Sequence, residues 1–232
     1  MQDLCAAIRG EIVSRKFPPG MRLSQRLGER WNVSRTPIRE ALRHLESEGF
    51  VHSTANRGFV VTSLTLRDLE QVYTLMIHLD SLAGRLATPR IAQDSEKLAG
   101  LRSLCEEMRF LGKQRDADGY ARANEEFHAL IFHASENAWL IRILEVIHGH
   151  ANRSILKAFH TSCRIEKPTQ EHAKILKWLE KGDARGAEKA IAAHFTNGLA
   201  DLRKELGIGE PPPTAAGQVV ALPAERKIRQ TP

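Results

Sequence analysis

The stretch VSRTPIREALRHLESEGFV, residues 33–51, constrains the fold of this chain more than any other part of it. Residues four positions apart share one face of an α-helix, so the basic and the apolar residues here separate onto two stripes. The basic stripe, called the arginine stripe below, is Arg35, Arg39 and Arg43. The apolar stripe is Ile38, Leu42 and Leu45. The apolar stripe predicts a helix packed on a core, whereas the arginine stripe predicts a partner outside that core.

The sequence around this helix predicts two more helices before it. Apolar residues at helical spacing predict a helix over residues 2–15, and the FPPG turn at 17–20 ends it. A second, short helix is predicted over 25–31. The helix that carries the arginine stripe then begins at Ser34 or Thr36, because either side chain can cap a helix N-terminus.

Gly49 is well suited to end the helix, and after it the residue pattern is no longer helical. β-branched and aromatic residues on both sides of an Asn-Arg-Gly turn predict a hairpin with strands over 50–53 and 59–62. Three helices followed by a β-hairpin predict a winged helix-turn-helix.

The rest of the chain predicts an all-helical bundle. Six helical segments follow one another, over residues 66–88, 95–114, 117–134, 138–161, 168–181 and 184–205. From Gly207 the sequence is rich in Pro, Ala and Gly and predicts a disordered tail. The expected fold is therefore mainly α, with a winged helix-turn-helix over 1–64, an antiparallel helical bundle over 65–206 and a tail over 207–232.

Composition favours a cytoplasmic protein with a polyanionic partner. The formal net charge is +6, and residues 1–65 hold ten Lys and Arg against six Asp and Glu, a local net of +4. The three cysteines, Cys5, Cys105 and Cys163, are far apart and form no CxxC pair, which favours a reducing compartment. No apolar run is long enough to span a membrane, and the N-terminus does not resemble a signal peptide.

The arginine stripe suits the major groove of DNA. In a helix-turn-helix, the N-terminal residues of the second helix meet base edges, and Arg35 and Arg39 lie at that end. An arginine fork can donate two hydrogen bonds to guanine, whereas Arg43 lies further along, where a phosphate contact is expected. The hydroxyls of Ser34 and Thr36 also suit phosphate. The hairpin tip, Arg57 and Gly58, can enter or flank a groove. The alternative is a solvated helix face on which Glu40 and Glu46 pair with the arginines.

The N-terminal sequence resembles a known family of DNA-binding domains. PPGMRLSQRLGERWNVSRTPIREALRHLESEGFV, with its PG turn, VSRTPIREAL, LxxEGFV and RG wing tip, resembles the DNA-binding domain of bacterial GntR-family regulators over about residues 4–62. The helical remainder resembles the FCD ligand-binding domain of the FadR subfamily, in its smaller VanR-like branch. The resemblance implies that Arg35, Thr36, Arg39, Arg57 and Gly58 contact DNA.

Four residues of the helical part could bind a metal. Asn124 and His128 are four apart on one predicted helix, and His172 and His194 lie on two later helices. Three imidazoles and one oxygen ligand suit zinc, nickel, manganese or iron. Spacing alone does not show that they converge, and the alternative is that each is a surface or a hydrogen-bonded core histidine. The other histidines His133, His148, His150 and His160 are expected to be structural or exposed. The resemblance implies the metal, because many FCD domains place an Asp or Asn four residues before a ligand His, with two more His on later helices.

The same resemblance implies an effector and a mode of action. Open coordination positions on the metal could bind the carboxylate of an organic acid. Met76 stands where the family commonly has an effector-binding Arg, so Arg85 or Arg153 would have to replace it, or the effector is less anionic or larger and more apolar. Met76 and Tyr73 at helical spacing also predict a plain packing face. The expected protein is a homodimeric, ligand-responsive regulator, most often a repressor in this family, that binds an inverted-repeat DNA operator.

Two other functions remain open from the sequence. One is a DNA-binding protein whose helical domain is packed, metal-free and devoted to interactions. The other is a metalloenzyme with an accessory DNA-binding head. For the enzyme the sequence has no HExxH motif, and Glu125 and Glu126 are expected to point away from the His128 face, so no general base is placed.

Overall fold

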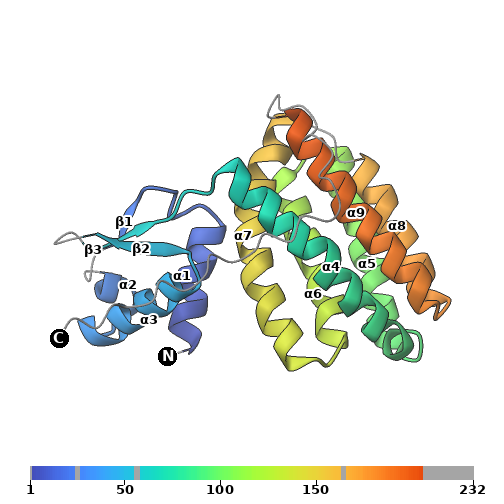
Figure 1. Cartoon of the computed structure of the whole chain (residues 1–232), viewed down its shortest axis with the longest axis horizontal. Helices are drawn as coiled ribbons and strands as arrows, with labels where there is room; N and C mark the ends of the chain where they lie inside the picture. Colours follow the sequence, from blue (N-terminus) through green and yellow to red (C-terminus); the bar gives the residue numbers. More distant parts are fainter. Residues whose placement is uncertain (1, 24–26, 55–57, 163–165, 206–232) are drawn as a thin grey trace, which may run out of the picture.

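The computed structural model describes residues 2–23, 27–54, 58–162 and 166–205. They form a winged-helix unit and a helical bundle, with α1 (Gln2–Val13) of the first unit lying next to α7 (Ala138–Ser162) of the second (Figure 1). The mainly helical fold expected from the sequence is confirmed. The predicted tail over 207–232 lies outside the described residues.

The winged-helix unit combines three helices with a small antiparallel sheet. The helices after α1 are α2 (Gly28–Trp31) and α3 (Arg35–Ser47), and the strands are β1 (Arg22–Leu23), β2 (Val51–Thr54) and β3 (Gly58–Val61). The sheet order is β1-β3-β2, with Val51 opposite Val61 and Leu23 opposite Phe59. The predicted hairpin is therefore present. Strand β1 was not predicted, because two residues are too short to show an alternating pattern.

The apolar stripe of α3 forms the centre of this unit. Ile38, Leu42 and Leu45 are fully buried, together with Ile8 and Ile12 of α1. The end of α3 is tied to the hairpin, because the backbone N–H of Ser53 donates to the Glu46 carboxylate at 2.6 Å. Helix α3 and the wing are thus held in a fixed relation to each other.

The bundle follows the predicted segments closely. Its helices are α4 (Leu66–Ile91), α5 (Ser95–Gln114), α6 (Ala117–Ala134), α7, α8 (Glu166–Glu180) and α9 (Ala184–Glu205). Local capping sets several starts: Thr65 and Asp68 form a capping box at α4, and Asp116 accepts from the N–H of Gly119 at α6. Helix α4 runs three residues past the predicted end, and Pro89 is accommodated in its last turn.

The core of the bundle is built from buried residues of α4 to α9. Met76 and Tyr73 of α4 are buried in it, with Phe127 of α6 and Phe195 of α9. Met76 is therefore a packing residue. None of the helices in the described part of the chain is long and apolar enough to cross a membrane.

Candidate functional site

The arginine stripe lies on the exposed face of α3, opposite the buried apolar stripe. Arg35, Arg39 and Arg43 are all exposed, and within the described residues none of them forms an ion pair. Glu46 bonds to the backbone of Ser53 instead, and this bond is the main reason why its pKa is lowered. The structure therefore does not show the arginine–glutamate pairs that a merely solvated helix face would have.

The N-terminus of α3 and the wing tip complete this surface. Ser34 is the N-cap residue, yet its exposed hydroxyl makes no capping bond. Thr36 is also exposed. Gly58 has a positive φ of 79°, which favours glycine. A Cβ there would also lie only 3.2 Å from the carbonyl oxygen of Leu23 on the paired strand β1. Arg57 lies outside the described residues.

Three of the predicted metal ligands converge inside the bundle. His128 of α6, His172 of α8 and His194 of α9 form what we call the histidine cluster, with one nitrogen of each within 4.8 Å of the others. The Nε2 atoms of His128 and His172 are 3.3 Å apart. His128 and His172 are buried, and His194 is 9% exposed. Sequence spacing could not show this convergence, because it depends on how three helices pack.

The environment keeps two of these imidazoles neutral. Burial is the largest cause that holds the pKa of His128 well below its usual value, followed by repulsion from His194, His172 and His148. Burial and then His194 hold the pKa of His172 well below its usual value as well, with a weak opposing effect of the Pro168 backbone. Neutral imidazoles keep a lone pair, which a metal ion requires.

Two carboxylates beside the cluster were not predicted. Glu171 of α8 accepts from the Nδ1 atom of His194 at 3.0 Å, and Asn197 donates to its other oxygen at 2.8 Å. The buried Asp80 of α4 pairs with Nε2 of His148 at 2.8 Å. The ring of His148 lies 5.7 Å from that of His128. Only Glu171 carries a sequence signal, its position next to His172, and that signal does not reveal its contact with a different helix.

The other predicted site residues lie on α6, α4 and α7. Asn124 is buried on α6, one turn before His128 and on the same face. Arg85 is half-exposed on α4 and pairs with Glu188 at 3.7 Å. The side chain of Arg153 lies outside the described part. Roles for Arg85 and Arg153 in effector binding stay predictions.

The histidine cluster fits a small divalent metal. Two nitrogens bound at 2.0–2.1 Å to one tetrahedral zinc lie about 3.3 Å apart, which matches the His128–His172 separation. The contact with Glu171 calls for the proton of His194 on Nδ1, so its Nε2 lone pair is free for a metal. The amide oxygen of Asn124 would supply the fourth ligand. Three neutral imidazoles and an amide are a donor set that transition metals accept.

Helix α7 connects this region to the winged-helix unit. Two residues after His148, His150 stacks on Phe50 with ring centroids 4.2 Å apart. Its Nε2 lies 2.8 Å from the carbonyl oxygen of Glu48, the C-cap residue of α3. Gly149 permits this approach, because a Cβ there would lie 2.7 Å from the Phe50 ring.

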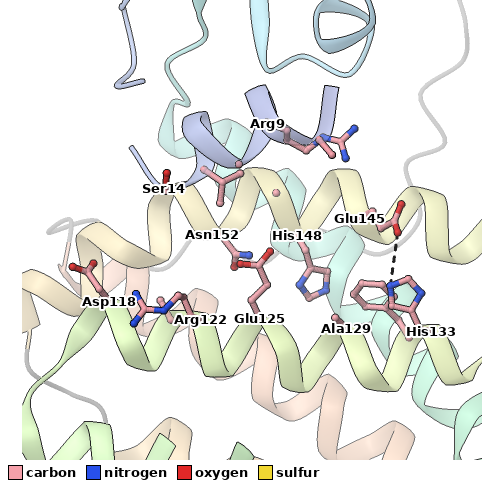
Figure 2. A pocket seen from close by; sticks show the side chains of 16 residues that line it. Arg9, Ser14, Asp118, Arg122, Glu125, Ala129, His133, Glu145, His148 and Asn152 are labelled. Carbon is pink, nitrogen blue, oxygen red and sulfur yellow. Dashed lines mark ion pairs between the residues drawn. The ribbon is translucent and has the colours of Figure 1, made fainter. Parts of the chain in front are cut away.

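Beside this contact, a pocket of about 590 Å³ separates α1 from α6 and α7. Arg9 of α1 lines it from the winged-helix unit, and Glu125, His148 and Asn152 line it from the bundle (Figure 2). Glu125 thus lines this pocket beside Asn152. The two units touch at a small contact and leave space next to it.

Both units match known protein families. Residues 1–61 match the family described as bacterial regulatory proteins, gntR family, and residues 71–197 match the FCD domain. The chain belongs to the GntR family of transcription regulators. The FCD match covers more than half of the chain. This GntR regulator therefore has an N-terminal DNA-binding unit, followed by an effector-binding FCD domain.

Relatives of this GntR regulator are similar over most of their length. It is 30% identical to the HTH-type transcriptional regulator YdhC of Bacillus subtilis, over 86% of this chain and 89% of the relative. It is also 30% identical to a Paenarthrobacter nicotinovorans protein named "Probable D-xylose utilization operon transcriptional repressor", over 79% and 80% of the two chains. The solved structure of Escherichia coli McbR/YncC has the same fold, with a TM-score of 0.78 at 21% identity, covering 88% of this chain and 97% of that one.

Proposed function

We propose that this GntR regulator is a cytoplasmic, ligand-responsive repressor that binds an inverted-repeat operator as a homodimer. The proposed DNA binding rests on the arginine stripe. Its three arginines are exposed on one face of α3 and have no ion-pair partners among the described residues. A two-fold dimer places two such helices on two half-sites, so the operator is expected to be palindromic.

The residues of this surface divide into base readers and phosphate contacts. Arg35 and Arg39, in the first turns of α3, read base edges in the major groove. Ser34 and Thr36 donate to phosphate from the helix start, and Arg43 contacts phosphate further along. The wing, with Arg57 and Gly58 at its tip, lies against or beside the neighbouring groove.

The effector site is proposed in the histidine cluster. Asn124, His128, His172 and His194 would hold a divalent transition metal: zinc, nickel, manganese or iron. When bound, the metal supplies a Lewis-acidic centre for the carboxylate of an organic acid. The protein would orient the metal by its buried imidazoles and shield it from water within the bundle.

A metal-free, packed bundle is the second candidate function for this domain. The 3.3 Å separation of His128 and His172 also suits an N–H···N hydrogen bond, which would pair the Nε2 atoms of the two rings without an ion. Elemental analysis of purified, untagged protein separates the two. About one metal per chain, lost in the His128→Ala/His172→Ala double variant, supports the metal site; no metal after dialysis against zinc, nickel or manganese supports the packed bundle.

The DNA-binding proposal is tested by a matched pair of substitutions. Arg39→Ala should cost about 1–3 kcal/mol in operator binding and relax sequence preference, because a base contact is lost. Arg43→Ala should weaken binding to all sequences alike and reduce the salt dependence, because a phosphate contact is lost. Fluorescence anisotropy with specific and scrambled duplexes measures both. Unchanged sequence preference in Arg39→Ala would rule out base reading by this residue.

A further inference from the structure

Glu171 is the carboxylate in direct contact with the histidine cluster. Its two oxygens are both used: one accepts from Nδ1 of His194 at 3.0 Å and the other from the amide of Asn197 at 2.8 Å. Glu171 is largely buried, with 12% of its side chain exposed. A carboxylate held from two sides by side chains of α9 has little freedom to turn away from His194.

The charges around the cluster make this contact important. The cluster and Asn124 together offer three imidazoles and one amide, all neutral when they bind a metal. A divalent ion would therefore keep its full charge within its own ligand set. A histidine that binds a metal becomes a stronger donor when its second ring N–H donates a hydrogen bond to a negatively charged group. In this cluster that group is Glu171.

We infer that Glu171 is a positioning residue that supplies, through His194, the negative charge that Asn124 does not bring to the metal. This inference rests on the proposed metal site. It assigns two effects to Glu171: it fixes the tautomer and orientation of His194, and it makes the imidazole a stronger donor. Neither effect requires Glu171 to touch the ion.

Asp80 is the other buried carboxylate nearby, and it cannot serve in the same way. It pairs with His148, whose ring is 5.7 Å from His128 and which is not one of the three converging histidines. Asp80 and Glu171 are thus similar in burial and in having a histidine partner, but only Glu171 bonds to a member of the cluster. Asp80→Asn is therefore a matched control.

The experiment measures Zn²⁺ affinity of the full-length protein by competition with a chromophoric chelator. Glu171→Gln keeps the size of the side chain and one acceptor oxygen but removes the charge, and it should bind Zn²⁺ about 10–100-fold more weakly. Asp80→Asn should change the affinity much less. Asn124→Asp should bind more tightly than the natural chain, because a carboxylate replaces the amide ligand.

The decisive variant is the double change Asn124→Asp/Glu171→Gln. If Glu171 compensates for a neutral residue 124, the new carboxylate should recover most of the affinity lost in Glu171→Gln. A merely structural role would give the same fold loss with Asn or Asp at position 124, and this result would overturn the inference. Circular dichroism of the metal-free variants checks folding. Should Glu171→Gln not fold, Glu171→Asp, which keeps the charge but shortens the reach to His194, is compared with Asn and with Asp at position 124, and an equal fold loss in both would overturn the inference.

Cobalt substitution distinguishes positioning from direct binding. The visible spectrum of bound Co²⁺ reports its ligands, so Glu171→Gln at saturating Co²⁺ should retain the bands of the natural chain, whereas Asn124→Asp should shift them. Shifted bands in Glu171→Gln would make Glu171 a ligand and overturn the positioning role. Absence of metal binding by the natural chain would instead refute the proposed metal site, and with it this inference.

Discussion

Single residues of the bundle show how burial sets its response to acid. His128 and His172 are enclosed in the core, and burial is the largest reason why the pKa of each is held well below the ordinary value of 6.5. In the unfolded chain both residues regain an ordinary pKa. The folded state therefore binds fewer protons than the unfolded state just below pH 6.5, and acid favours unfolding.

Metal-free protein should consequently lose stability as the pH falls below about 6.5, by up to about 1.4 kcal/mol per pH unit for each of the two histidines. The loss continues until the pH reaches their folded-state pKa values, and above pH 7 these residues add no slope. Urea unfolding in the presence of a chelator between pH 5 and 8 measures it. His128→Leu should flatten the profile, whereas exposed His133→Gln should not. A natural chain equally stable at pH 5 and 7 would contradict the assigned neutrality of the pair.

Glycines on two helices show how packing between elements depends on single methyl groups. A Cβ on Gly84 of α4 would lie 2.2 Å from Cδ1 of Ile191 on α9, within the buried core. A Cβ on Gly10 of α1 would meet no atom within 4 Å. Both positions are helical, so an alanine gains the same helix propensity at either one.

Gly84→Ala should therefore destabilise the protein by about 1–2 kcal/mol, because the overpacking of α4 against α9 exceeds the gain in propensity. Gly10→Ala should stabilise it by about 0.5–1 kcal/mol, because only the propensity changes. Thermal unfolding of the two variants beside the natural chain tests both. A stabilised Gly84→Ala would mean that Ile191 moves aside freely and that the α4–α9 contact is loosely packed.

The helices themselves could be predicted from the sequence, because each has a local cause. Apolar spacing, capping residues such as Asp116 and breakers such as Gly182 act within a few positions, so the predicted segments of the bundle agree closely with the observed ones. Asn124 and His128 could be placed together for the same reason, since they share a helix face. Strand β1 could not be predicted, because it exists only through its pairing with β3.

Contacts between helices could not be derived from local patterns, and the convergence of the cluster histidines was implied only by the family resemblance. The convergence of His172 and His194, the bond from His194 to Glu171, and the pair of Asp80 with His148 all join residues from separate elements. No local sequence pattern specifies such contacts between helices, because they follow from the packing of the whole bundle. His148, expected to be structural or exposed, is a buried structural residue that pairs with Asp80 beside the cluster.

At the scale of the whole molecule, α7 joins the surroundings of the histidine cluster to the end of α3. His148 faces His128, and two residues later His150 contacts Glu48 and Phe50 at the end of α3. The pocket between α1 and the bundle leaves the rest of this interface loosely filled. A shift of α7 would therefore act on the end of α3 through His150.

His150→Ala should uncouple the two sites while leaving each intact. In the natural chain, Zn²⁺ and operator should alter each other's affinity by the same factor, because the coupling is reciprocal. The variant lacks the stacking on Phe50 and the bond to Glu48, so its operator affinity should be nearly the same with Zn²⁺ as with a chelator. Anisotropy titrations under both conditions measure the ratio, and Zn²⁺ affinity should stay unchanged because His150 is not in the cluster. His78→Ala, which changes an exposed histidine of α4, is the control and should keep the natural ratio. If His150→Ala retained that ratio as well, the coupling would have to pass through α4 and the segment that joins it to the wing, rather than through α7.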